Sequence, residues 1–196
     1  MRILLSRSFN SRTQCYKYES LESDTDIYMG YAKRNSLYSK PFYIVKYKNI
    51  EVCRFEDDNM FRRWLVLISI LIPRLRAKYI LKMEGLRDNC VLKSNGRFFS
   101  IIIDRNTYLI KGHSKCVVTI WENDIQVGII KRNDICLGNG FETIEILYES
   151  HIPTILIILF SIFGWEKYVG TVNANRTQTT IFLNEEKYDA NWKPKA

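Results

Sequence analysis

The sequence predicts a mainly β protein, a closed or strongly curved antiparallel barrel around one buried hydrophobic helix. Two observations predict this fold. Short β-favouring stretches follow one another from Phe42 to Tyr148, with too little chain between them for parallel crossovers. The fourteen residues from Ile152 to Trp165 are then almost wholly apolar. A helix that is apolar on every side must be surrounded by protein, which a curved sheet provides.

The size and composition fit one folded domain over residues 1–196, with ends that fray at about 1–15 and 185–196. The chain has 46% apolar and 26% charged residues, ordinary values for a globular protein. It contains no repeat and no linker that would divide it.

The predicted strands begin with a hairpin over Phe42–Phe55, turning at Lys48-Asn49, in which Ile50, Val52 and Arg54 share one face. The clearest hairpin is Lys115–Trp121 with Ile125–Lys131, joined by the three polar residues Glu122–Asp124. The other predicted strands are Ala77–Met83, Arg97–Ile103, Thr107–Lys111, Thr143–Tyr148 and a last one at Thr179–Leu183.

The apolar run Ile152–Trp165 is too short to cross a bilayer, which takes about 20 residues. As a helix it is about 21 Å long, the width of a small core. Pro153 suits the first turn, Gly164 suits the end, and His151 at the entrance is placed to cap a backbone N–H.

A second apolar run, Trp64–Ile72, lies between clusters of basic residues. We expect its apolar side chains to insert between lipid headgroups while the cations bind anionic phosphate. The alternative is a core helix or connector with solvated ends. The predicted headgroup ligands are Arg62, Arg63, Arg74, Arg76 and Lys78, and the predicted interfacial residues are Trp64, Leu65 and Leu67.

The net charge of +8 comes entirely from the N-terminal part of the chain. Residues 1–82 contain 16 Lys and Arg against 8 Asp and Glu, whereas residues 83–196 contain 13 of each. Such an excess is typical of a surface that meets phosphates, and also of a merely solvated face. The first residues lack the apolar stretch of a secretory signal, so we expect a cytoplasmic protein, which the lipid hypothesis would place at a membrane surface. Residues 1–18 are basic and contain no acid, a composition typical of an organellar transit peptide and also of a basic first strand or a frayed end.

The five cysteines form no CxxC pair, and with two histidines they do not give the spacing of a zinc site. We therefore expect reduced thiols, no metal and no cofactor. Phosphate-loop and dinucleotide motifs are absent as well.

The order of these features resembles the tubby C-terminal-like superfamily, which includes the LURP-one-related proteins and the phospholipid scramblases. The matching pieces are the hairpin Phe42–Phe55, the run Trp64–Ile72, the meander Ala77–Tyr148 and the run Ile152–Gly164. The resemblance implies a closed barrel around a central hydrophobic helix. Because tubby domains bind phosphoinositides and scramblases act at membranes, it also implies a lipid ligand, without transferring any particular residue.

The leading prediction is thus a non-enzymatic module that binds anionic phospholipid at a membrane surface. The alternative is a nucleic-acid-binding protein that uses the basic N-terminal part and its tyrosines. A third class is a small hydrolase that uses His113 or His151, for instance with Cys116 as a partner of His151.

Overall fold

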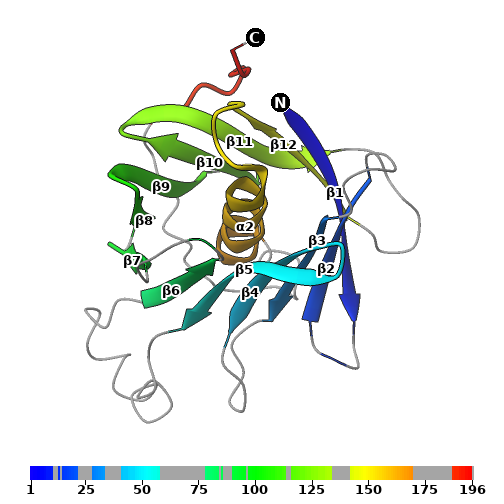
Figure 1. The fold of residues 1–196 in the computed structure, drawn as a ribbon. Helices are drawn as coiled ribbons and strands as arrows, with labels where there is room; N and C mark the ends of the chain where they lie inside the picture. Colours follow the sequence, from blue (N-terminus) through cyan, green and yellow to red (C-terminus); the bar gives the residue numbers. More distant parts are fainter. Residues whose placement is uncertain are drawn as a thin grey trace, which may run out of the picture.

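The computed structural model describes residues 1–10, 13, 15–21, 28–33, 41–57, 78–83, 85, 90–95, 97–113, 116–133, 142–169 and 187–195. These residues form strands and two helical segments (Figure 1). The strands are β1 Arg2–Asn10, β2 Cys15–Ser20, β3 Tyr28–Lys33, β4 Phe42–Tyr47, β5 Ile50–Asp57, β6 Lys78–Met83, β7 Cys90–Ser94, β8 Phe98–Ile103, β9 Asn106–His113, β10 Val117–Glu122, β11 Ile125–Asn133 and β12 Glu142–Tyr148. The helix α2 spans Thr154–Gly164, and the π-helical segment η1 follows at Trp165–Val169.

The strands form a closed antiparallel barrel, as predicted. Each strand pairs with its neighbours in the chain, and β1 closes the circle by pairing with β12. In that closing ladder Leu5 lies opposite Ile144, and Ser6 lies opposite Thr143. The closed sheet leaves no unpaired strand edge in the described barrel.

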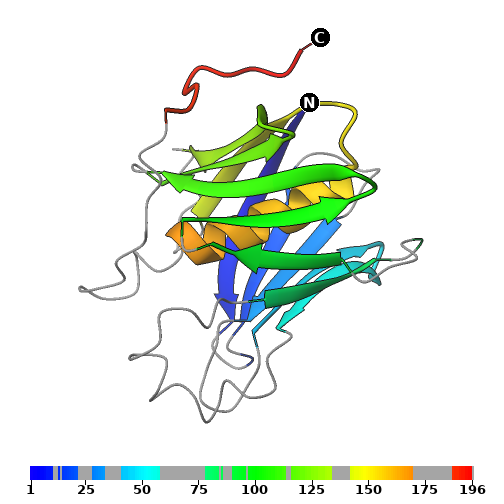
Figure 2. The same ribbon diagram turned by 90° about the vertical axis from the view of Figure 1, so that its left-hand side faces the viewer.

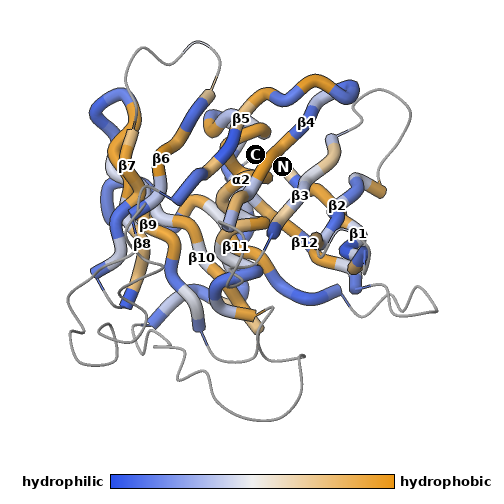
Figure 3. Tube along the Cα trace, turned by 90° about the horizontal axis from the view of Figure 1, so that it is seen from below, coloured by the Kyte–Doolittle hydropathy of each residue, from blue (hydrophilic) through white to orange (hydrophobic). Residues whose placement is uncertain are grey.

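Helix α2 fills the barrel, which confirms the prediction for the apolar run. The helix lies inside the ring of strands (Figure 2). Every residue from Leu156 to Gly164 is buried. Phe160 and Phe163 contact Phe55 with ring centroids 6.2 and 5.3 Å apart. Burying one such side chain contributes about 1.5–3 kcal/mol, so this helix supplies much of the core. Hydrophobic and hydrophilic residues follow one another along the surrounding strands (Figure 3).

The α-helix ends at Gly164, as predicted, but the chain does not leave the helical conformation there. The backbone continues through η1 to Val169. A Cβ atom on Gly164 would lie 2.8 Å from Val118 and 3.0 Å from Ile110, so the glycine permits close packing against β9 and β10. At the other end Pro153 precedes α2 without any side-chain cap, and His151 hydrogen bonds to Glu122 instead.

The two predicted hairpins are present as β4–β5 and β10–β11. The turn of the second hairpin has two residues instead of the predicted three. Its turn is Asn123-Asp124, and both residues have positive φ, as in type I′ turns. In β5 the residues that face the core are Cys53 and Phe55, whereas Ile50 is 67% exposed. Strands β2, β3 and β7 have no counterpart in the predictions, and the predicted strand Thr179–Leu183 lies outside the described residues.

The two ends of the barrel differ in their connections. At the end where α2 begins, which we call the turn end, β4–β5, β8–β9 and β10–β11 are joined by two-residue turns. The opposite end contains η1. No helix in the described ranges has the length and apolarity needed to cross a bilayer.

Candidate functional site

The side chains of η1 connect the end of the helix to different sides of the barrel. Four consecutive residues each reach another strand. Trp165 donates to Glu142 of β12, Glu166 accepts from Arg7 of β1 and Tyr18 of β2, Lys167 donates to Tyr79 of β6, and Tyr168 donates to the carbonyl of Ile110 in β9. This segment therefore fixes the position of α2 inside the barrel.

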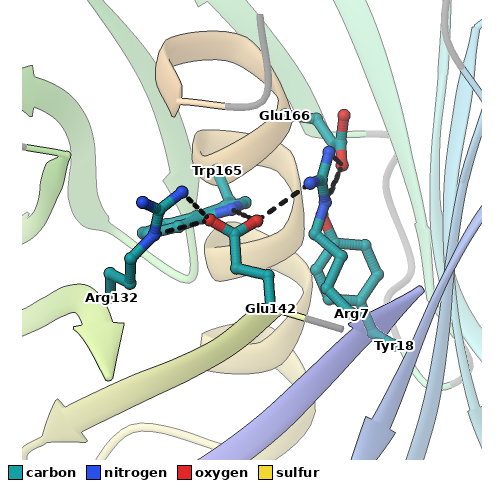
Figure 4. Close-up of polar contacts among 6 residues, drawn as sticks. All are labelled: Arg7, Tyr18, Arg132, Glu142, Trp165 and Glu166. Atoms are coloured by element: carbon teal, nitrogen blue, oxygen red, sulfur yellow. Dashed lines mark hydrogen bonds and ion pairs between the residues drawn. The ribbon is translucent and has the colours of Figure 1, made fainter. Parts of the chain in front are cut away.

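A buried ion network lies on one side of η1 (Figure 4). The guanidinium of Arg7 donates to Glu166 at 2.8 Å and to Glu142 at 2.9 Å. The hydroxyl of Tyr18 donates to the same Glu166 carboxylate at 2.5 Å. The exposed Arg132 binds the other oxygen of Glu142 at 2.6 Å. Two carboxylates thus meet two guanidinium groups.

Electrostatics keep this network in its ion-paired form. Burial disfavours the charge on Arg7, but Tyr18, Glu166 and Glu142 outweigh it, and the pKa of Arg7 lies above its ordinary value. Burial, and then the Glu166 carboxylate, raise the pKa of Tyr18, so its hydroxyl remains a donor. The charges balance within the group, which fits a structural lock on the helix.

Lys167 differs from Arg7 because it has no acidic partner among the described residues. Its Nζ atom donates to the hydroxyl of Tyr79 at 2.5 Å. The same atom lies 5.8 Å from the ring centroid of Tyr43 and 5.7 Å from that of Phe163. Lys167 as a whole residue is partly exposed, whereas Tyr43 and Tyr79 are buried.

The η1 end of the barrel is strongly basic. We define the basic end as η1 with the four residues of each strand nearest to it. It contains ten Lys and Arg (Arg7, Lys17, Lys33, Arg54, Lys78, Lys93, Lys111, Lys131, Arg132, Lys167) and five Asp and Glu (Glu56, Asp57, Glu142, Glu145, Glu166), a net charge of +5. The remaining strand residues carry three cations (Arg2, Lys46, Lys82) and three acids (Glu19, Glu51, Glu122).

Of the predicted headgroup ligands, the structure describes only Lys78. It begins β6 at the basic end and is exposed. Its direct partner across the ladder is Lys93, which is also exposed. Like charges opposite one another are destabilising without a counter-ion, so this pair favours an anionic partner. The other predicted residues, Arg62, Arg63, Trp64, Leu65, Leu67, Arg74 and Arg76, lie outside the described residues.

The structure does not bring together Cys116 and His151, the cysteine–histidine pair considered from the sequence. Cys116 is at the basic end and His151 is at the turn end, so the barrel separates them. His113 is buried, with Nε2 2.8 Å from Thr119 Oγ1 and its ring 4.3 Å from Tyr188. His151 is exposed and lies 2.6 Å from Glu122. Within the described ranges, no group of three or more His, Cys, Asp and Glu could hold a metal ion.

The sequence did not point to Arg7, Glu142, Glu166 or Lys167. Arg7 and Glu166 are 159 residues apart in the chain, and only barrel closure brings them together. The one available hint was the pair Glu166-Lys167 directly after an apolar run. The closed barrel around one C-terminal helix is compatible with the tubby-like fold. No protein-family model, curated protein or solved structure matches this chain.

Proposed function

We propose that this protein is a non-enzymatic module that attaches its basic end to an anionic phospholipid surface. The observation that carries the proposal is the charge difference along the barrel, +5 at the basic end against zero over the remaining strand residues. A cation near an anionic membrane contributes about 1 kcal/mol. Exposed residues such as Lys78 and Lys93 act in this way without having to form fixed contacts.

An aromatic residue at the same end favours a membrane over nucleic acid. Phe9 lies near the end of β1 and is 51% exposed, with its ring 4.9 Å from that of Tyr16. The guanidinium of Arg7 lies over the Tyr16 ring, 3.9 Å from its centroid. An exposed phenyl group next to cations suits the boundary between headgroups and acyl chains. The resemblance to tubby-like proteins supports the same ligand class.

Sedimentation with vesicles tests this proposal. Wild type should bind vesicles that contain phosphatidylserine and should not bind pure phosphatidylcholine. The double variant Lys78→Glu, Lys93→Glu should bind at least about 30-fold more weakly, since it loses two cations worth about 1 kcal/mol each and gains two carboxylates that the membrane repels. The matched control is Lys48→Glu, Arg105→Glu, which makes the same charge change in exposed turns at the turn end.

Equal binding by the two double variants would overturn the assignment to the basic end. If no variant bound vesicles but labelled single-stranded oligonucleotides shifted in a salt-dependent manner, the protein would be a nucleic-acid-binding protein instead.

A further inference from the structure

We propose that Lys167, Tyr43 and Tyr79 form a seat for one phosphate group inside the basic end. The choice of an anionic ligand rests on the proposed function, but the seat is separate from the exposed lysines Lys78 and Lys93. The phosphate can belong to a lipid headgroup or be free in solution, because both present the same oxygens.

The geometry brings an ammonium donor close to two phenol groups. Lys167 Nζ donates to Tyr79 at 2.5 Å, which leaves the phenol proton of Tyr79 available for another acceptor. The ring centroids of Tyr79 and Tyr43 lie 4.8 and 5.8 Å from the ammonium. Tyr79 is fully buried and Tyr43 is 2% exposed, whereas Lys167 is partly exposed. A phosphate would therefore approach from the Lys167 side.

The charge of this ammonium lacks compensation among the described residues. Its neighbour Glu166 binds Arg7, with both side chains almost fully buried. A bound phosphate would supply the counter-ion that these residues do not provide.

The protonation states suit the ligand. Burial opposes the charge on Lys167, but its contacts with Tyr43 and Tyr79 outweigh burial, and the pKa of the ammonium lies above its ordinary value. Burial raises the pKa of Tyr43, so this hydroxyl is neutral and can donate. A phosphate oxygen accepts readily from both an ammonium and a hydroxyl group.

Calorimetric titration of the full chain with inorganic phosphate and with soluble dihexanoyl phosphatidic acid tests the seat. Lys167→Met should weaken binding of both ligands at least about tenfold, since a hydrogen bond to a charged group contributes about 1.5–3 kcal/mol. Tyr79→Phe, which keeps the ring, should weaken binding less. The variant Lys78→Glu, Lys93→Glu should keep its affinity for inorganic phosphate, whereas its binding to anionic vesicles should be weakened.

The two proposals fail in different ways. Equal phosphate affinity of Lys167→Met and wild type would overturn the seat, and so would vesicle binding by a wild type that binds neither phosphate nor phosphatidic acid. Binding of phosphatidic acid alone would support the seat and assign it to a lipid headgroup. If Lys167→Met failed to fold, as judged by circular dichroism, Tyr43→Phe, Tyr79→Phe would decide the question with the charge retained.

Discussion

Arg7 and Arg2 lie on the same strand but in opposite environments. The Arg7 side chain is 8% exposed and that of Glu166 is 1% exposed, whereas Arg2 is 52% exposed beside Glu145. Removing one member of a buried pair leaves an uncompensated charge, which usually costs about 3–5 kcal/mol. An exposed pair contributes at most about 1 kcal/mol. The burial of its ion pair therefore decides how much each arginine contributes to the free energy of unfolding.

Arg7→Met should lower the free energy of unfolding by about 3–5 kcal/mol, and Arg2→Met by less than about 1 kcal/mol. Urea denaturation of the two variants measures both values. Similar losses in the two variants would mean that the network around Glu166 is not what holds this side of η1.

The buried tyrosines make stability dependent on alkaline pH. Burial, and then the hydrogen bond to Glu122, raise the pKa of Tyr108 from 10.0 to about 12. Burial raises the pKa of Tyr18 and Tyr43 in the same direction. Between pH 10 and about pH 12, the phenol of Tyr108 is deprotonated in the unfolded chain but still protonated in the folded protein. The free energy of unfolding therefore keeps its full value below pH 10 and declines as the pH rises from 10 to about 12.

Urea denaturation across that range, followed together with phenolate absorbance, should show this decline. Tyr108→Phe should make the decline shallower, because one of the linked protons is gone. A free energy of unfolding that stays constant over the range would contradict the assigned shifts.

At the scale of elements, η1 packs so closely against β9 that only glycine fits at one position. A Cβ atom on Gly112 would lie 2.2 Å from two ring atoms of Tyr168, whose hydroxyl is bound to Ile110. A Cβ atom on Gly30 would lie 2.1 Å from the terminal methyl of Ile162, a flexible group that can turn away. The neighbour of Gly30 can therefore move away from an added methyl group, whereas the ring beside Gly112 is held in place.

Gly112→Ala should cost about 1–3 kcal/mol of unfolding free energy, the usual range for overpacking, and Gly30→Ala should cost clearly less. Thermal denaturation of the pair tests the difference. The reverse order would show that Ile162 is held more firmly than the ring of Tyr168.

Among the strands that the sequence analysis missed, β3 lacks a hydrophobic alternation for a physical reason. In β3 the residues that face the core are Gly30 and Ala32, since α2 approaches there. A strand with a core face of small residues shows no apolar pattern. The extension of α2 into η1 was missed because Gly164 has the appearance of a helix end, whereas its lack of a Cβ atom serves packing.

At the scale of the whole molecule, helix and barrel form one core. Ile158 is fully buried at the centre of α2, while Ile125 is 66% exposed in the turn end. An unpaired carboxylate at position 158 would cost several kcal/mol, a large share of the 5–15 kcal/mol that stabilises a typical domain.

Ile158→Asp should therefore unfold the entire barrel, and Ile125→Asp should leave it folded. Circular dichroism and gel filtration distinguish the two results. A soluble, folded Ile158→Asp protein would show that the barrel stands without its helix.

The candidate site was less predictable than the fold, because it depends on closure. The excess of basic residues was visible in the sequence. Their gathering at one end of the barrel was not, because successive strands run in opposite directions and the basic residues lie at the start of some strands and at the end of others. The partners of Glu166 and Lys167 come from β1, β2 and β6, far away in the chain. No local pattern reports such contacts.

The order of elements also has a consequence for how the protein is made. All strands of the barrel precede α2 in the chain, so a ribosome synthesises the wall before the element that fills it. Until Thr154–Val169 emerges, residues such as Phe55 and Tyr79 have no helix to pack against. We expect the nascent chain to expose its inner apolar faces late into synthesis, when it depends most on chaperones.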